Sequence, residues 1–220
     1  MKKATSAGAA VYTPFTLKLY DWWVLSVSNQ YAWRCPTSAN LLPHFVKHTG
    51  DSHLDIGVGT GYYLTHLPEN CQLALADLNH NSLQVAARRV GTERVNKSLA
   101  HDIYQPFPAE WQQQFDSVSL FYLLHCLPGT MTDKQVVIKH AAMALKPDGQ
   151  LSGATILGKG VSHNAFGRKL MAVYNKKGIF SNQLDCENTL HEALSTCFTD
   201  LEINVVGTVA LFRASSPRVA

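Results

Sequence analysis

Three alternating glycines directly after a short apolar run constrain the fold of this 220-residue chain more than any other feature. Leu54 and Ile56 flank Asp55 in a strand-like pattern, and residues 57–61 then read Gly-Val-Gly-Thr-Gly. Glycines at alternate positions allow a tight turn and let a ligand approach the backbone closely. A helix is expected over residues 62–67. The pattern therefore predicts a strand, a glycine turn and a helix N-terminus that faces a carboxylate or phosphate group.

The length and composition indicate one globular domain with a sizeable core, since 46% of the residues are hydrophobic. The net charge of +3 is mild and the basic pairs are scattered, so nucleic acid is not expected as a partner. The chain has neither an apolar signal segment nor an apolar run long enough to span a bilayer, so no membrane association is expected. The five cysteines show no paired spacing, which favours a cytoplasmic location.

Strand-like and helix-like segments alternate along most of the chain. This order predicts an α/β fold, a Rossmann-like, doubly wound and mostly parallel seven-stranded sheet, with a C-terminal antiparallel β-hairpin and an N-terminal helical lid. Beyond the first strand, the predicted strands cover residues 72–77, 95–100, 115–122 and 150–156, with the hairpin at 201–206 and 208–213. The predicted helices cover residues 14–28, 39–48, 79–90, 132–145 and 189–198.

The predicted organisation is a single domain with three parts. Residues 1–49 form the helical lid, residues 50–214 form the core, and residues 215–220 form a loose tail. Thr132 and Gln135 have the spacing of a capping box, which predicts that the helix after the fourth strand begins at that point.

Three acids stand at or near the ends of the first three strands, namely Asp55, Asp77 and Asp102. In a parallel sheet these ends meet at one edge, which is where ligands bind in such folds. Asp77 lies 20 residues beyond Gly57, the spacing at which an acid accepts the hydroxyls of an adenosine ribose. Nicotinamide enzymes and methyltransferases share this pattern. For Asp102 an alternative is that it only caps the turn before Pro106.

Several motifs in order resemble those of the class I S-adenosylmethionine-dependent methyltransferases, over roughly residues 50–213. Each motif alone is weak, and their order along the chain makes the resemblance specific. They are residues 54–61 (LDIGVGTG), 76–79 (ADLN), 100–103 (AHDI), 115–118 (FDSV) and 145–149 (LKPDG).

The resemblance implies S-adenosylmethionine as the cofactor and assigns roles to individual residues. The glycine turn would lie against the methionine part, with Asp55 orienting its ammonium group. Asp77 would take the ribose hydroxyls, and Leu78 would pack on the adenine. Asp102 and the amide of Ile103 would read the adenine edge, and Phe121 would supply a carbonyl near the amino acid end. The implied cofactor-binding set is Asp55, Gly57, Gly59, Gly61, Asp77, Leu78, Asp102, Ile103 and Phe121.

A phenol or alcohol acceptor has to lose a proton, and His125 after the fourth strand is the candidate general base because the usual imidazole pKa is ~6.5. The alternative is a structural imidazole that ties the turn 124–129 to a neighbouring backbone group. Tyr20, Trp33 and His163 are candidates for substrate contact. Hydrophobic anchoring of the N-terminal aromatics and a solvated loop histidine are the competing interpretations.

The sequence therefore predicts methyl transfer to a small-molecule acceptor, at oxygen or nitrogen. One alternative is a protein that binds S-adenosylmethionine without transferring methyl. A more distant one is a nicotinamide-dependent oxidoreductase, although the glycines run G-x-G-x-G rather than G-x-G-x-x-G. His44 and His48 could share a helical face, but no Glu or Cys completes a metal site, so none is predicted.

Overall fold

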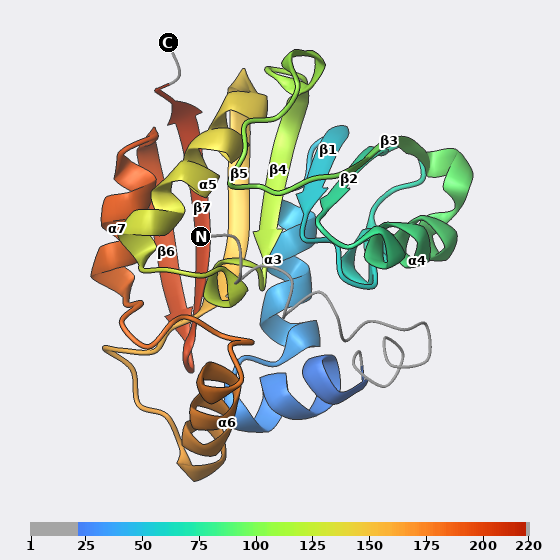
Figure 1. Cartoon of the computed structure of the whole chain (residues 1–220). Coiled ribbons are helices and arrows are strands. Elements are labelled where there is room, and N and C mark those ends of the chain that lie inside the picture. Colours follow the sequence, from blue (N-terminus) through green and yellow to red (C-terminus); the bar gives the residue numbers. More distant parts are fainter. Residues whose placement is uncertain (1–21, 219–220) are drawn as a thin grey trace.

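The computed structural model describes residues 22–218 and contains a seven-stranded sheet in the order β3-β2-β1-β4-β5-β7-β6. Figure 1 shows this sheet running through the molecule with helices on both faces. The predicted α/β fold class is confirmed. The strands are β1 (Ser52–Ile56), β2 (Gln72–Asp77), β3 (Val95–Ala100), β4 (Phe115–Phe121), β5 (Leu145–Ile156), β6 (Phe198–Val206) and β7 (Val209–Pro217).

Neighbouring strands from β3 to β5 in the sheet are parallel to one another. Strand β7 is antiparallel to both of its neighbours, β5 and β6. Chain order reverses between β1 and β4, because β2 and β3 lie on one side of β1 while β4 and β5 lie on the other. This reversal creates the crevice in which doubly wound sheets bind ligands. The hairpin of β6 and β7 turns at Gly207, whose φ of 62° is readily adopted only by glycine.

Two hydrophobic clusters cover the two faces of the sheet. On one face, Leu54 and Ile56 of β1 pack with residues from helices α5 (Met131–Ala144) and α7 (Glu187–Ser195). On the other face, residues from α3 (Leu42–Lys47) and α4 (His80–Val90) pack against strand residues that include Leu73 and Leu75. Alternation along β1 therefore directs His53 and Asp55 toward the α3 side.

The first element among residues 22–218 is a π-helical segment, η1 (Trp22–Ala32), which is followed by η2 (Thr37–Leu41) and α3. Helix α6 (Ala165–Lys176) packs against η1, and Figure 1 shows both beyond the carboxyl ends of the parallel strands. Residues 1–21, which hold most of the predicted first helix, and residues 219–220 lie outside the described residues. The division into lid, core and tail stays a prediction. No helix within residues 22–218 is long and apolar enough to cross a membrane.

Three local predictions were wrong. Helix α5 begins at Met131, and its capping box is formed by Thr130 and Asp133 rather than by Thr132 and Gln135. The helix starts earlier because Gly129, with a φ of 93°, ends the preceding turn. Strand β5 was predicted to start at residue 150, but residues 145–149 already form its irregular first part. Helix α6 was not predicted, although Asn164 caps its N-terminus by accepting a bond from the Gly167 N–H at 2.7 Å.

Candidate functional site

A cavity of about 230 Å³ opens at the carboxyl ends of β1, β2 and β4, at the point where the strand order reverses. Most of the residues predicted to bind the cofactor lie in its wall, and they come from three strand ends and the turns that follow. These residues are Asp55, Gly57, Gly59, Asp77, Leu78, Asp102, Ile103 and Phe121. The structure therefore brings together side chains that are up to 66 residues apart in the sequence.

The glycine turn behaves differently at each of its three glycines. The Gly57 N–H donates to the Ala76 carbonyl at 2.8 Å, which ties the turn to β2. Gly59 has a φ of 53°, and no atom lies within 4 Å of the position that a Cβ would occupy, so this part of the turn is open. Gly61 has a φ of 70°, and a Cβ there would lie 2.9 Å from the Cα of Ala86 in α4.

Gly61 is also absent from the cavity wall. The missing side chain permits close packing of the turn on α4, and the predicted role of Gly61 in cofactor binding stays a prediction. The predicted helix over residues 62–67 is only a single 3₁₀ turn, η3 (Tyr63–His66). The expected helix N-terminus facing the ligand is thus not present, and the turn itself is what the structure offers to a bound group.

Asp55 and Asp77 face the cavity from adjacent strands and are both largely enclosed. Burial raises the pKa of Asp55 to about 7, and the hydrogen bond from Ser119 opposes this rise. Burial likewise raises the pKa of Asp77 to about 6, although backbone N–H groups, including that of Asn79 at 2.8 Å, partly offset the effect. Two carboxylates held out of water in this way are suited to a cation and to hydroxyl donors.

Asp102 caps a turn and also lies in the cavity wall. Its side chain accepts a bond from the Tyr104 N–H at 3.1 Å and its carbonyl accepts one from Gln105 at 2.8 Å, so it caps a turn. It also lies in the cavity wall beside the buried Ile103 and His101.

His125 does not lie in the cavity wall. It sits in the 3₁₀ turn η6 (Leu124–Cys126), where it is only 3% exposed. The Ile156 N–H donates to its Nδ1 at 3.3 Å, and Phe180 packs against the ring at 4.6 Å between centroids. Burial lowers the pKa of His125 to about 3, so the imidazole is too weak a base near neutrality. This position favours the structural role that was considered as the alternative, and the role of His125 as a general base stays a prediction.

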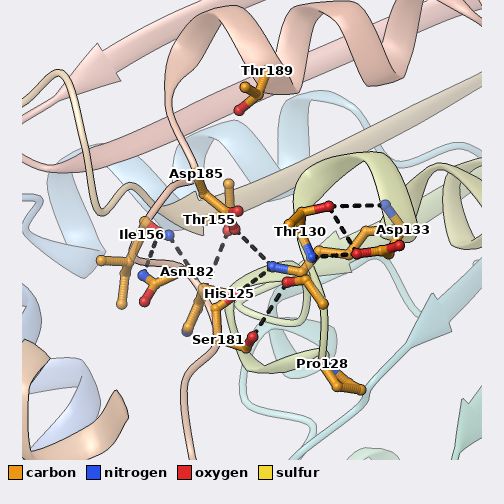
Figure 2. A network of polar contacts seen from close by, with 12 residues as sticks. His125, Pro128, Thr130, Asp133, Thr155, Ile156, Ser181, Asn182, Asp185 and Thr189 are labelled. Atoms are coloured by element: carbon orange, nitrogen blue, oxygen red, sulfur yellow. Dashed lines mark hydrogen bonds and ion pairs between the residues drawn. The ribbon is translucent and has the colours of Figure 1, made fainter.

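His125 lies in a network of polar contacts that includes Ser181 and Asp185, as Figure 2 shows. The Ser181 N–H donates to the His125 carbonyl at 2.8 Å, and the Ser181 hydroxyl donates to the Gly129 carbonyl at 3.2 Å. Lys134 of α5 donates to Asp185 at 2.7 Å and to the Ser181 carbonyl at 2.8 Å, and both charged side chains are almost completely buried. These contacts hold residues 178–185, the connection between α6 and α7, against η6 and α5.

The three predicted substrate residues have different outcomes. Tyr20 lies outside the described residues. Trp33 is 2% exposed, and its ring packs edge-on against that of His163 at 6.2 Å. The Nε2 of His163 contacts the Leu157 carbonyl at 2.9 Å. Neither Trp33 nor His163 lies in the cavity wall, and substrate contact by these residues stays a prediction.

Sequence reasoning missed the wall of the cavity that is not formed by strand ends. Tyr122 is the most informative case, because its φ of 56° is unusual for a non-glycine residue and its hydroxyl has no hydrogen-bond partner among the described residues. Its sequence context is that of an ordinary strand end. The missed apolar and aromatic lining residues are Val24, Leu25, Tyr62, Tyr63, Tyr122, Leu123, Leu127 and Ile179.

The charge of the cavity fits one kind of ligand. Three carboxylates line it, and no lysine or arginine is found among its described lining residues. Carboxylates attract a positive charge and accept hydrogen bonds from hydroxyl groups, so this lining suits a ligand with both features and suits a pyrophosphate poorly. Within the described part of the chain no cluster of three or more His, Cys, Asp or Glu side chains could hold a metal ion. His44 and His48 contact one another, and His44 also contacts the Phe212 carbonyl.

Comparison with known proteins gives a consistent result. Residues 54–151 match the model of a methyltransferase domain. The chain is 53% identical to the putative uncharacterized protein YbcY of Escherichia coli, over 88% of this chain and 100% of that protein. It is 44% identical to the physcion biosynthesis cluster O-methyltransferase of Aspergillus chevalieri, over 98% of this chain and 97% of that protein.

A solved structure with a similar fold is that of the N-methyltransferase NodS from Bradyrhizobium japonicum, in complex with S-adenosyl-L-homocysteine. It superposes with a TM-score of 0.62 at 17% identity, over 93% of this chain and 98% of that one.

Proposed function

The chain belongs to the class I S-adenosylmethionine-dependent methyltransferases, and we propose that it transfers the methyl group to an oxygen or nitrogen atom of a small-molecule acceptor. The observation that carries this proposal is a single cavity with two kinds of lining. Buried carboxylates follow the strand ends, and apolar side chains come from η1, from the segment after β4 and from residue 179. One lining suits the cofactor, and the other suits an apolar organic acceptor.

The cofactor roles proposed for individual residues follow from their positions. Asp77 would accept the ribose hydroxyls, and Asp102 with Ile103 would read the adenine beside His101 at the third strand end. Asp55 is placed beside the glycine turn to attract the ammonium group of the methionine part. When bound, S-adenosylmethionine supplies an electrophilic methyl group on a sulfonium sulfur.

The acceptor would be held by apolar walls rather than by a charged group. Val24 and Leu25 of η1 face the same cavity as Leu123, Leu127 and Ile179. Transfer of a methyl group is an in-line displacement, so alignment of the acceptor atom and exclusion of water account for much of the rate. The proposal gives these tasks to the apolar wall and gives no proton-transfer role to His125.

Oxygen is the acceptor atom that we favour, because the A. chevalieri relative, which is similar over nearly the whole of both chains, is an O-methyltransferase. An apolar wall is also compatible with a flat aromatic acceptor such as a phenol.

The test is release of S-adenosylhomocysteine from S-adenosylmethionine over a panel of phenols, aromatic amines and carboxylates, with the methylated atom located by mass spectrometry. We expect turnover with one or more phenols. Calorimetry with S-adenosylhomocysteine and with NAD is run beside it, and heat is expected only with the former. Binding of S-adenosylhomocysteine without turnover of any panel member would reject a phenol, amine or carboxylate acceptor.

A further inference from the structure

A column of four polar side chains crosses the core directly beneath the cavity. His53 and Asp55 project from one face of β1, and Ser117 and Ser119 project from the same face of the neighbouring β4. The register pairs His53 with Ser117 and Asp55 with Ser119. His53 and both serines are completely buried, and the column ends at Asp55 in the cavity wall.

The apolar surroundings make this column unusual. Phe45 of α3 packs against the His53 ring at 5.4 Å between centroids. Buried polar groups are tolerated when they bond to one another, and here every neighbour in the column is within hydrogen-bond distance. The distances are 2.8 Å from Gly50 N to Ser117 Oγ, 2.8 Å from Ser117 Oγ to His53 Nδ1, 3.1 Å from His53 Nε2 to Ser119 Oγ, and 2.5 Å from Ser119 Oγ to Asp55 Oδ1.

The hydrogens in this column are ordered when Asp55 is ionised. A carboxylate has no proton to donate, so the single hydroxyl hydrogen of Ser119 points to Asp55. The His53 Nε2–H must then donate to Ser119, and its unprotonated Nδ1 accepts from Ser117. This arrangement needs a neutral imidazole, and burial does lower the pKa of His53 to about 3. Each bond in the column therefore carries one hydrogen, directed toward the carboxylate.

A neighbouring serine shows that the fold does not require such bonding. Ser152 of β5 is paired in register with Ser119 and is also completely buried, yet its hydroxyl has no hydrogen-bond partner among the described residues. The ordered bonds are therefore a property of the β1–β4 pair beneath Asp55, and they are absent one strand further along.

We propose that His53 and Ser119 are positioning residues that keep the Asp55 carboxylate ionised and aimed at the ammonium group of the cofactor. The inference rests on the proposed function, in which Asp55 receives that group. Without Ser119, burial and the nearby charge of Asp77 would both favour the protonated acid. The other titratable groups in the cavity wall are Tyr62, Tyr63, His101, Asp102, Tyr122 and Cys126. Burial raises the pKa of Tyr122 well above its ordinary value and that of Cys126 to about 12, so neither is charged near neutrality.

The test is calorimetry of S-adenosylhomocysteine binding between pH 6 and pH 8.5, using the Ser119→Ala protein. Loss of a hydrogen bond to a charged group predicts binding about ten- to a hundredfold weaker at pH 6.5. The difference from wild type should narrow as the pH rises, because the carboxyl group then ionises without help. Ser119→Thr keeps the hydroxyl and should restore most of the affinity at pH 6.5. His53→Leu should give a smaller shift in the same direction, because Ser119 then loses only the group that orients it.

Ser152→Ala is the matched control, since it removes a buried hydroxyl at the same level of the sheet and should leave the pH profile unchanged. Asp55→Asn separates the inference from its premise. If that variant binds as tightly as wild type, the proposed role of Asp55 fails. If Asp55→Asn abolishes binding while Ser119→Ala binds with the wild-type pH profile, the positioning role is overturned.

Discussion

The change Gly61→Ala tests the structural reading of the glycine turn, and its effect can be worked out from two separate penalties. Gly61 has a φ of 70°, and an L-residue in this left-handed region costs about 1–2 kcal/mol. The new methyl group would also lie 2.9 Å from both the Cα and the Cβ of Ala86, so α4 would have to shift. Overpacking of this kind costs about 1–3 kcal/mol. The expected total is about 2–5 kcal/mol of unfolding free energy, a large share of the roughly 5–15 kcal/mol of an ordinary domain.

Two other glycines provide matched controls for the two penalties. Gly160 has a φ of 78° and lies outside the cavity wall, and its nearest contact for a Cβ is an ordinary 3.7 Å to Cys186. Gly160→Ala should therefore lower the unfolding free energy only by the conformational penalty of about 1–2 kcal/mol. Gly59→Ala should lose a similar amount, because nothing lies within 4 Å of its Cβ position, but it lies in the cavity wall and should weaken ligand binding.

The assay is urea unfolding of the three apo variants followed by circular dichroism, with S-adenosylhomocysteine calorimetry on each folded protein. Gly61→Ala should be less stable than Gly160→Ala by about 1–3 kcal/mol, the overpacking penalty alone. Equal losses for these two variants would refute the packing argument. A Gly61→Ala protein of normal stability that binds ligand as poorly as Gly59→Ala would restore the sequence-based assignment of Gly61 to the cofactor.

Three further predictions follow from the buried ionisable groups. Lys134→Met leaves the carboxylate of Asp185 buried without its partner and should lower the unfolding free energy in urea by about 3–5 kcal/mol. The double variant Lys134→Met with Asp185→Leu should lose less stability than either single variant. Additive losses would contradict this prediction. The pKa values of Asp55 and Asp77 are raised in the folded protein, so the folded state holds these protons more tightly than the unfolded chain. Protonation of these two acids therefore stabilises the apo protein fully below about pH 4, and this stabilisation is lost as the pH rises through about 6 to 7. The thermal shift given by S-adenosylhomocysteine should thus be larger at pH 7.5 than at pH 5.5, and an equal shift would contradict the link between these acids and the ligand. His125→Ala should lower the melting temperature, because the Ile156 N–H loses its partner, but should leave the kcat of the folded enzyme within a few-fold of wild type; a loss of several hundredfold would revive the catalytic role.

Much of the site at the strand ends could be predicted because its determinants are local. A glycine turn after an apolar strand needs only residues 54–61, and the acids at 77 and 102 follow from the ends of neighbouring parallel strands. The topology then brings them to one edge without further information. The same local logic could not reveal the packing at Gly61, where a Cβ would meet Ala86, a residue in a helix 25 positions later.

The sequence-based expectations for His125 and for the start of α5 differ from the structure for the same physical reason. His125 follows the fourth strand, where a base could face the cavity. Residues 178–185 fold over it instead, so that Ser181 bonds to its carbonyl and Phe180 packs against its ring. Nothing within a few residues of His125 encodes that cover. The start of α5 could not be fixed from the sequence, because the threonines at 130 and 132 can both cap a helix. The structure uses Thr130, directly after the turn that ends at Gly129.

This difference in encoding also separates the two ends of the cavity. The acids and glycines follow consecutive strands of one sheet, so their arrangement is fixed by the sheet itself. The apolar wall is assembled from η1, from the segment after β4 and from residue 179, and the last of these is placed by the buried contact between Lys134 and Asp185 and by the Ser181 bonds. Substitutions in η1 or in residues 178–185 can therefore reshape the proposed acceptor wall without disturbing the strand ends that we propose bind the cofactor. A chain with this fold can keep one cofactor while its acceptor changes, which explains why the sequence identifies the methyl donor more sharply than the molecule that receives the methyl group.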